Sequence, residues 1–248
     1  MLETADRLRV VLVGTRNPLN IGAAARAMSN FGFLRLRLVK PYDVAFREAR
    51  SAMAAAPVLA TAEEYGSLPE AVGDCTLVVG TTAVGHRELH HQVHRPEYTA
   101  RLMRTELITG NVALLFGAEK TGLSNDDLSH CHCLMRIPTR EEHFSMNLGQ
   151  AVAVCLYELV RDATKARLSA KKVVNQRATA GEVELLSASL LDALHLSGYV
   201  NPLAVTVTEE RVRRMVRRLS LSSEDAELWL GMLRQILWRM RAGFTPQP

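Results

Sequence analysis

The chain contains several short apolar runs, and each of them leads into a polar loop. The first run, LRVVLVG, spans residues 8–14, and further runs lie within 75–83, 111–123 and 133–138. A run of this length, bounded by turn residues, is typical of a buried strand. Strands that alternate with helices predict an α/β fold with a mostly parallel sheet flanked by helices. Ligands of such sheets bind beyond the carboxyl ends of the strands, so the polar loops are candidate binding loops.

The rest of the first 162 residues supplies helices and one further strand. Residues 34–39, LRLRLV, alternate apolar and basic side chains and predict a half-exposed strand. Residues 45–56 predict a helix that Pro57 ends. Asn20 is the predicted N-cap of the helix after the first strand. A further helix over 145–162 carries an apolar stripe with helical spacing: Leu148, Val152, Cys155, Leu156 and Leu159.

The sequence changes in character after residue 160. We expect an α/β domain over 1–162, a basic linker over 163–179 and a helical extension over 180–248, with helices near 180–197, 208–219 and 222–241. Residues 161–248 contain 14 Lys and Arg but 9 Asp and Glu, whereas the preceding part is nearly neutral. Such an excess suits a polyanion such as RNA, although a solvated helical surface accounts for it equally well. The basic side chains concerned are Lys171, Lys172, Arg177, Arg211, Arg213, Arg214, Arg217 and Arg218.

Composition also predicts where the protein works. No apolar run approaches the ~20 residues that a membrane span requires. The polar, acidic N-terminal stretch does not resemble a signal peptide. The four cysteines are scattered and do not suggest a disulfide framework. We therefore expect a cytoplasmic protein with no membrane partner.

The glycine spacing argues against two nucleotide-binding classes. Gly14 and Gly22 are too far apart for the G-x-G-x-x-G fingerprint of a dinucleotide-binding loop. The later loop GAEKTG, residues 117–122, places Lys-Thr before its last glycine rather than after it. A nucleoside triphosphatase is excluded on this pattern, and a nicotinamide-dependent oxidoreductase is disfavoured.

Histidines and cysteines gather in two places without forming a metal-binding motif. His90 and His94 have helical spacing, but the pattern of a zinc protease is missing. Cys131 and Cys133 lie in HCHC without a second ligand pair at zinc-finger spacing. We therefore expect no metal, and histidines that face solvent or RNA.

Arg26 is the only charged residue in the helix that follows the first strand, where it shares a face with Gly22 and Asn30. The planar guanidinium can bind a phosphate or an anionic transition state with two donors. The alternative is a surface arginine whose stem covers Ala23.

Three loops, over 80–85, 116–123 and 137–149, contain glycine and small polar residues. These loops allow a ligand to approach the backbone closely, although ordinary turns have the same composition.

Three stretches become specific in combination. NPLNIGAAARA (17–27), FGAEKTGLSNDDL (116–128) and IPTREEHFSMNLGQAVAV (137–154) resemble, in order and spacing, the motifs of the SPOUT-class RNA 2′-O-ribose methyltransferases. The stretches at 184–202 and 212–237 resemble the C-terminal extension of the TrmJ-type tRNA methyltransferases within that class. The resemblance implies a trefoil knot, a homodimer with its active site near the subunit interface, and S-adenosyl-L-methionine as the cofactor.

The resemblance also assigns roles to individual residues. Arg26 matches the catalytic arginine, which acts near the cofactor of the partner subunit. Asn20, Glu119, Ser145 and Asn147 match the other catalytic positions, of which Ser145 and Asn147 help to place the ribose or the methionine end. Because arginine side chains stay protonated, we expect electrostatic positioning rather than proton removal as the main role of Arg26. The residues that match cofactor-binding positions are Thr82, Ala83, Val84, Gly117, Ile137, Phe144, Ser145 and Met146.

Two positions depart from the family pattern on the side expected to face RNA. Arg87 is the arginine available in the first loop, where relatives often have one nearer the middle of the loop. His143 stands where a tyrosine often occurs. Substrate preference can differ for this reason. The residues that we first expect to contact RNA are Arg26, Arg87, Arg140, His143, Lys171, Lys172, Arg211, Arg214 and Arg218. The neighbouring Arg177, Arg213 and Arg217 are expected to hold tRNA phosphates with them.

The leading hypothesis is therefore a tRNA 2′-O-methyltransferase, which on the TrmJ-type resemblance acts on cytidine or uridine at nucleotide 32 of the anticodon loop. Methylation of ribosomal RNA or of another tRNA position is the alternative within the class. A non-catalytic RNA-binding module is the alternative outside it, and the presence of Arg26, Glu119, Ser145 and Asn147 argues against that alternative.

Overall fold

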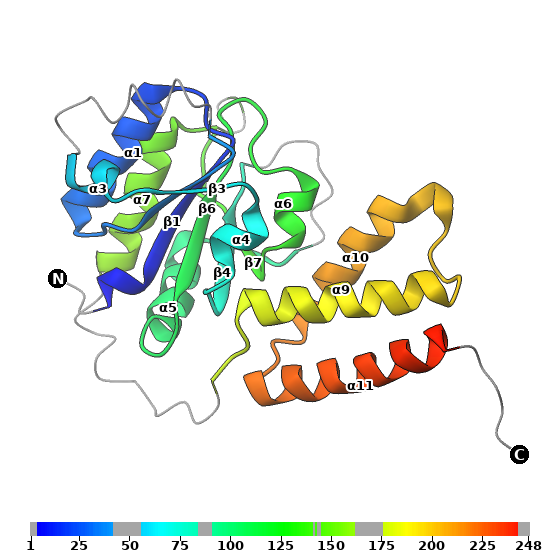
Figure 1. The fold of residues 1–248 in the computed structure, drawn as a ribbon. Helices are drawn as coiled ribbons and strands as arrows, with labels where there is room; N and C mark the ends of the chain where they lie inside the picture. Colours follow the sequence, from blue (N-terminus) through cyan, green and yellow to red (C-terminus); the bar gives the residue numbers. More distant parts are fainter. Residues whose placement is uncertain are drawn as a thin grey trace, which may run out of the picture.

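The computed structural model describes residues 4–41, 56–83, 91–140, 142, 145–161 and 176–242. Within these residues, seven parallel strands form one sheet in the order β3-β2-β1-β6-β4-β7-β5 (Figure 1). The strands are β1 (Leu8–Val13), β2 (Leu36–Val39), β3 (Glu63–Tyr65), β4 (Leu77–Thr81), β5 (Val93–His94), β6 (Val112–Phe116) and β7 (Cys133–Met135). The expected α/β class with a parallel sheet is confirmed.

Helices cover both faces of the sheet. One face packs against α1 (Pro18–Phe31), α3 (Ala56–Ala60), α5 (Pro96–Glu106) and α7 (Leu148–Arg161). The other face packs against α4 (Leu68–Val72), α6 (Asn125–Ser129) and the beginning of α9 (Ala180–Leu196). The predicted stripe of α7 is confirmed, because all five of its members are buried in the first of these two cores. Because the helices cover the two faces, the loops that follow the strands lie at the carboxyl edge of the sheet, where a ligand can bind.

Two predictions about helix ends are wrong. Asn17, not Asn20, is the N-cap of α1, and its side chain accepts a hydrogen bond from the Leu19 N–H. Proline is favoured in the first turn of a helix, so α1 begins at Pro18 and leaves Asn20 inside that turn. Pro57 lies within α3, which continues to Ala60, rather than ending a helix. The predicted helix over 45–56 lies outside the described residues except for Ala56.

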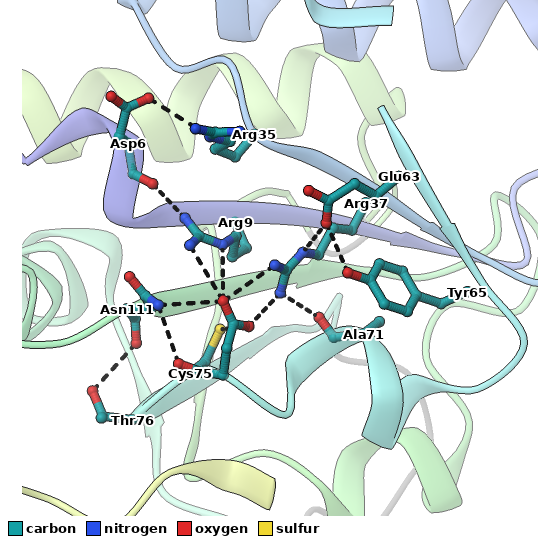
Figure 2. A network of polar contacts seen from close by, with 11 residues as sticks. Asp6, Arg9, Arg35, Arg37, Glu63, Tyr65, Ala71, Cys75, Thr76 and Asn111 are labelled. Carbon is teal, nitrogen blue, oxygen red and sulfur yellow. Dashed lines mark hydrogen bonds and ion pairs between the residues drawn. The ribbon is translucent and has the colours of Figure 1, made fainter. Parts of the chain in front are cut away.

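The prediction of a half-exposed strand at 34–39 is also wrong, because all four residues of β2 are buried. Arg37 is tolerated there because its guanidinium donates to Glu63 at 2.9 Å, to the Ala71 carbonyl at 2.9 Å and to Asp74 (Figure 2). Asp74 also accepts from Arg9, at 3.3 Å. Burial lowers the pKa of Arg37, but the hydrogen bond and charge of Asp74 outweigh burial and raise it. The alternation of apolar and basic residues therefore reflects an ion-pair network rather than a solvent-facing side.

Asp74→Asn is expected to destabilise the protein by about 2 kcal/mol at pH 7, a value discounted because the Asp74 side chain is 40% exposed. Burial raises the pKa of Asp74, but Arg37 and Arg9 lower it below its ordinary 3.8 overall. A lowered folded-state pKa means that the stabilisation is present above 3.8 and is lost as the pH falls through the folded pKa. Urea unfolding of both proteins from pH 7 into this acidic range measures the effect. A difference in unfolding free energy that stays constant across the range contradicts it.

The helical extension consists of α9, η4 (Pro202–Ala204), α10 (Val205–Arg218) and α11 (Ser223–Arg241), which share a core of their own. A capping box of Thr179 and Glu182 begins α9. Ala180 is buried in the core of the sheet domain, and its N–H donates to the Cys75 carbonyl at 2.7 Å. The extension is therefore packed onto the sheet domain (Figure 1). None of the described helices is long and apolar enough to cross a membrane.

Candidate active site

A cavity of about 640 Å³ lies at the carboxyl ends of three neighbouring strands. Thr81, Phe116 and Met135, which are the last residues of β4, β6 and β7, line it. The loops that follow these strands supply most of the remaining lining. The volume lies within the range of small-molecule sites, and the lining mixes apolar side chains with polar loop groups. The position is the one that the parallel sheet predicts for a ligand.

Most of the residues that the resemblance assigns to the cofactor meet at this cavity. Thr82 and Ala83 line it from the first loop, and the Thr82 N–H donates to the Met135 carbonyl at 3.0 Å. The other predicted residues that line the cavity are Gly117, Ile137, Ser145 and Met146. Val84 and Phe144 lie outside the described residues.

Three residues far apart in sequence form a hydrogen-bonded chain at the edge of the cavity. The Asn20 side-chain amide donates to Glu119 Oε1 at 3.0 Å. The Asn147 side-chain amide donates to Asn20 Oδ1 at 3.0 Å. All three residues line the cavity. This chain joins α1, the loop after β6 and the start of α7 into one polar wall.

Glu119 is held in its charged form. Burial raises its pKa, but hydrogen bonds from Asn20 and from backbone N–H groups, including that of Asn17, outweigh burial and lower the pKa overall. An ionised carboxylate fixes the Asn20 side chain with its amide nitrogen towards Glu119 and its oxygen towards Asn147. Glu119 therefore orients the hydrogen-bonded side chains of Asn20 and Asn147, and it is not a proton donor at neutral pH.

Asn147 also determines where α7 begins. Its side-chain oxygen accepts from the Gly149 N–H at 3.0 Å, which is the hydrogen bond of an N-cap. Gly149 allows close packing, because a Cβ at this position would lie 2.6 Å from the Ala23 Cβ on α1. The close approach of α1 and α7 brings Asn20 within reach of Asn147. Sequence analysis missed the capping roles of Asn17 and Asn147, although an asparagine before each helix was a usable signal.

Arg26 lies on the solvent-exposed face of α1 and does not line the cavity of its own chain. It shares that face with Ala23, one turn away, and with Leu19, two turns away. The interpretation of Arg26 as a surface residue over Ala23 and the interpretation as a catalytic residue both fit this position. The two interpretations differ in whether another molecule covers the face.

The remaining basic and metal-ligating candidates fall into three groups. Arg140 is exposed near Ile137, whereas Arg87, His143, Lys171 and Lys172 lie outside the described residues. Cys131 and Cys133 are buried free thiols, and burial raises the pKa of the Cys133 thiol to about 11. In the part of the chain that the structure describes, no group of three or more His, Cys, Asp or Glu side chains is arranged to hold a metal ion.

The arginines of α10 serve two different purposes. Arg217 is 2% exposed and donates to Glu184 at 2.8 Å, so the expectation that it contacts RNA is wrong. Arg213 donates to Asp126 on α6 at 2.7 Å and so also attaches the extension to the sheet domain. Both arginines lie on the face of α10 that packs against the rest of the protein, so they form internal ion pairs. Arg211 and Arg218 remain exposed, whereas the side chain of Arg214 is only 13% exposed and pairs with Glu210 at 3.4 Å.

Comparison with known proteins identifies relatives of the whole chain. Residues 7–157 match the model of the SpoU rRNA Methylase family. A tRNA (cytidine/uridine/adenosine-2′-O-)-methyltransferase TrmJ from Pseudomonas aeruginosa is 35% identical over 239 residues, which cover 92% of this chain and 93% of that protein. A tRNA (cytidine/uridine-2′-O-)-methyltransferase TrmJ from Pectobacterium atrosepticum is 32% identical over 235 residues, with 93% and 97% covered.

Comparison with solved structures also identifies methyltransferases that match most of the chain. The crystal structure of TrmJ from Z. mobilis ZM4 superimposes with a TM-score of 0.78 and 30% identity, covering 92% of this chain and 98% of that chain. A probable methylase family protein from Haemophilus influenzae superimposes with a TM-score of 0.58 and 28% identity, covering 96% and 99%. Both matches extend beyond the sheet domain into the helical extension.

Proposed function

The chain belongs to the SpoU rRNA methylase family and is a methyltransferase, and from this premise we propose that it methylates the ribose 2′-hydroxyl of tRNA with S-adenosyl-L-methionine as the methyl donor. The observation that carries the proposal is the cavity of about 640 Å³ bordered by the Asn20–Glu119–Asn147 chain. The relatives named as tRNA 2′-O-methyltransferases cover more than nine tenths of the chain, including its extension.

The cavity fits the proposed cofactor in size and chemistry. Apolar side chains such as Leu123, Met135 and Ile137 provide surfaces for an adenine ring, and the loop over 117–122 offers backbone groups for its polar edge. Ser145 and Asn147 also line the cavity, where their side chains can bind the methionine end of the cofactor or the ribose of the RNA. Bound S-adenosylmethionine supplies a methyl group activated by a positively charged sulfur. No metal is needed for this chemistry.

The residues of the chain then have two tasks. They must hold the ribose oxygen in line with the methyl group, because alignment alone supplies a large share of the rate of such displacements. They must also stabilise the negative charge that develops on that oxygen. We assign the second task to Arg26, whose guanidinium can bind the adjacent phosphate and the developing alkoxide at the same time.

This assignment requires a second subunit, because Arg26 does not line the cavity of its own chain. We propose a homodimer in which Arg26 acts beside the cofactor of the partner. The outer faces of α1 and α7 support it, since Leu19 is 79% exposed and Tyr157 is 50% exposed there. Exposed apolar side chains grouped around a functional residue are typical of an interaction surface.

Three finer features are part of the proposal. Nucleotide 32 of the anticodon loop is the proposed target. On α10, the exposed Arg211 and Arg218, with Arg214 between them, would bind tRNA phosphates. We also propose the trefoil knot that the resemblance implies. The proposed location is the cytoplasm, where tRNA is modified.

Methylation of ribosomal RNA is the second candidate, because the matching family is named for it. Mapping of ribose methylation in total tRNA and rRNA, with and without the gene, separates the two. We expect the modification at tRNA nucleotide 32 to disappear while rRNA is unchanged. Loss of an rRNA site favours the second candidate, and an unchanged map contradicts both. Calorimetry with S-adenosylmethionine and with NAD is an independent check, in which we expect heat of binding from the former alone.

A further inference from the structure

A second, much smaller cavity lies where the helical extension meets the sheet domain. Thr76 and His132 line it from the segments before β4 and β7, and Arg177 lines it from the segment that leads into α9. Arg217 lines it from the last turn of α10, and Ser220 lines it from the segment that follows. Its volume is about 10 Å³, which is room for a single particle the size of a water molecule. It shares no residue with the large cavity.

Arg217 is the most unusual residue of this cavity. Its side chain is almost completely buried, and its Nη2 donates to Glu184 at 2.8 Å. Its Nε and Nη1 are also buried, yet neither nitrogen has a hydrogen-bond partner among the described residues. Buried guanidinium groups are normally satisfied on all sides, so two spare donors indicate a missing acceptor.

The lining is cationic as well as rich in donors. Arg177 and Arg217 both belong to it, and no Asp or Glu does among the residues described. From outside the lining, Glu106 pairs with Arg177 at 3.7 Å and Glu184 pairs with Arg217 at 2.8 Å. Burial, followed by the charges of Arg217 and Arg177, lowers the pKa of His132 to about 3. His132 is therefore neutral at pH 7 and adds no further positive charge to the lining.

We propose that this cavity binds one monatomic anion of halide size, with Arg217 as its principal ligand. The two unpaired N–H donors belong to a charged guanidinium, and hydrogen bonds from such donors are strongest with an anionic acceptor. The cavity holds one particle, so sulfate and phosphate are too large. The anion would touch the sheet domain, the segment leading into α9 and the end of α10. It would therefore stabilise the attachment of the extension, and the inference does not depend on which RNA is methylated.

Thermal unfolding of the full-length protein tests the proposal. At a matched ionic strength of about 0.15 M, sodium chloride or bromide is expected to raise the Tm by about 2–4 °C over sodium gluconate. In Arg217→Met this difference between the salts is expected to vanish. Arg234→Met removes an exposed arginine on α11 and is expected to retain it. Because each variant is compared with itself in two salts, its own change in stability cancels.

Crystals grown in bromide provide a measurement that needs no variant to fold. We expect an anomalous peak in the cavity within reach of Arg217 Nε or Nη1. A water molecule at that place without anomalous signal overturns the proposal. A halide effect on the Tm that persists in Arg217→Met, or that is missing from the wild type, also overturns it.

Discussion

Replacing Arg26 by alanine is expected to lower the kcat of methyl transfer by about 10²–10³-fold, because it removes the donors that stabilise developing negative charge. Arg26→Lys keeps the charge but loses the planar fork, so we expect at least a ~10-fold loss. The Kd for S-adenosylmethionine is expected to stay unchanged, because Arg26 does not line the cavity of its own chain. Single-turnover kinetics with saturating tRNA, together with calorimetry, measure both quantities.

Arg101→Ala is the matched control, since it removes an exposed arginine from α5. It is expected to leave kcat near the wild-type value. Near-normal turnover of Arg26→Lys with unchanged RNA binding would contradict the role of the guanidinium geometry. A rise in the Kd for the cofactor would place Arg26 at the cavity of its own subunit instead.

Mixing two inactive variants tests whether Arg26 acts across the dimer. Gly117→Ala disrupts the cavity, because a Cβ there would lie 2.1 Å from the backbone of Gly122. In an equal mixture with Arg26→Ala, half of the dimers combine both subunits, and one of their two sites is intact. We therefore expect recovery of about a quarter of the wild-type activity. No recovery contradicts an active site shared between subunits.

Removing the positive charges of Arg211, Arg214 and Arg218 on α10 is expected to weaken tRNA binding by about 10–10³-fold near physiological salt. The variant is Arg211→Gln, Arg214→Gln and Arg218→Gln combined. The slope of log K against log salt is expected to become shallower by roughly 0.9 for each phosphate contact that is lost. Cofactor affinity is expected to remain unchanged, because none of the three lines the large cavity. Filter binding across a salt series measures the affinity and the slope together.

A triple substitution on α11 provides the control, with Arg234, Arg239 and Arg241 replaced by Gln for the same change in net charge. An equal loss of affinity in both triple variants would mean that only the overall charge matters. No loss in the α10 variant would show that these three arginines do not bind tRNA. Deleting the extension is a poorer test, because Ala180 is part of the core of the sheet domain.

The secondary structure and the location of the large cavity were predictable because local patterns determine them. Short apolar runs gave β1, β4, β6 and β7, and helical spacing gave the buried stripe of α7. The carboxyl ends of parallel strands meet at one edge, so loops far apart in sequence could be expected to meet there. The residues assigned by resemblance were found at that edge wherever the structure describes them, apart from Arg26.

The wrong predictions share one physical cause. The role of a charged or polar side chain depends on the residues that surround it in the folded protein, which can be distant in sequence. Arg37 looked solvent-facing because Asp74 is distant in sequence. Arg217 looked like a phosphate ligand because nothing local indicated that Glu184 and His130 would bury it. Asn20 looked like an N-cap because the partners of its side chain are distant in sequence. Glu119 lies 99 residues after Asn20, and Asn147 lies 127 residues after it.

The sequence by itself determined the α/β class, the helical extension and the loops that carry the candidate site, because apolar spacing and turn residues act over a few positions. Only the tertiary structure decided which polar residues work together. Hydrogen bonds and ion pairs form over about 3 Å, and folding alone brings α1, the loop after β6 and the start of α7 to that separation. The same process turned Arg217 inward against the sheet domain and left Arg26 exposed, where a second subunit can use it.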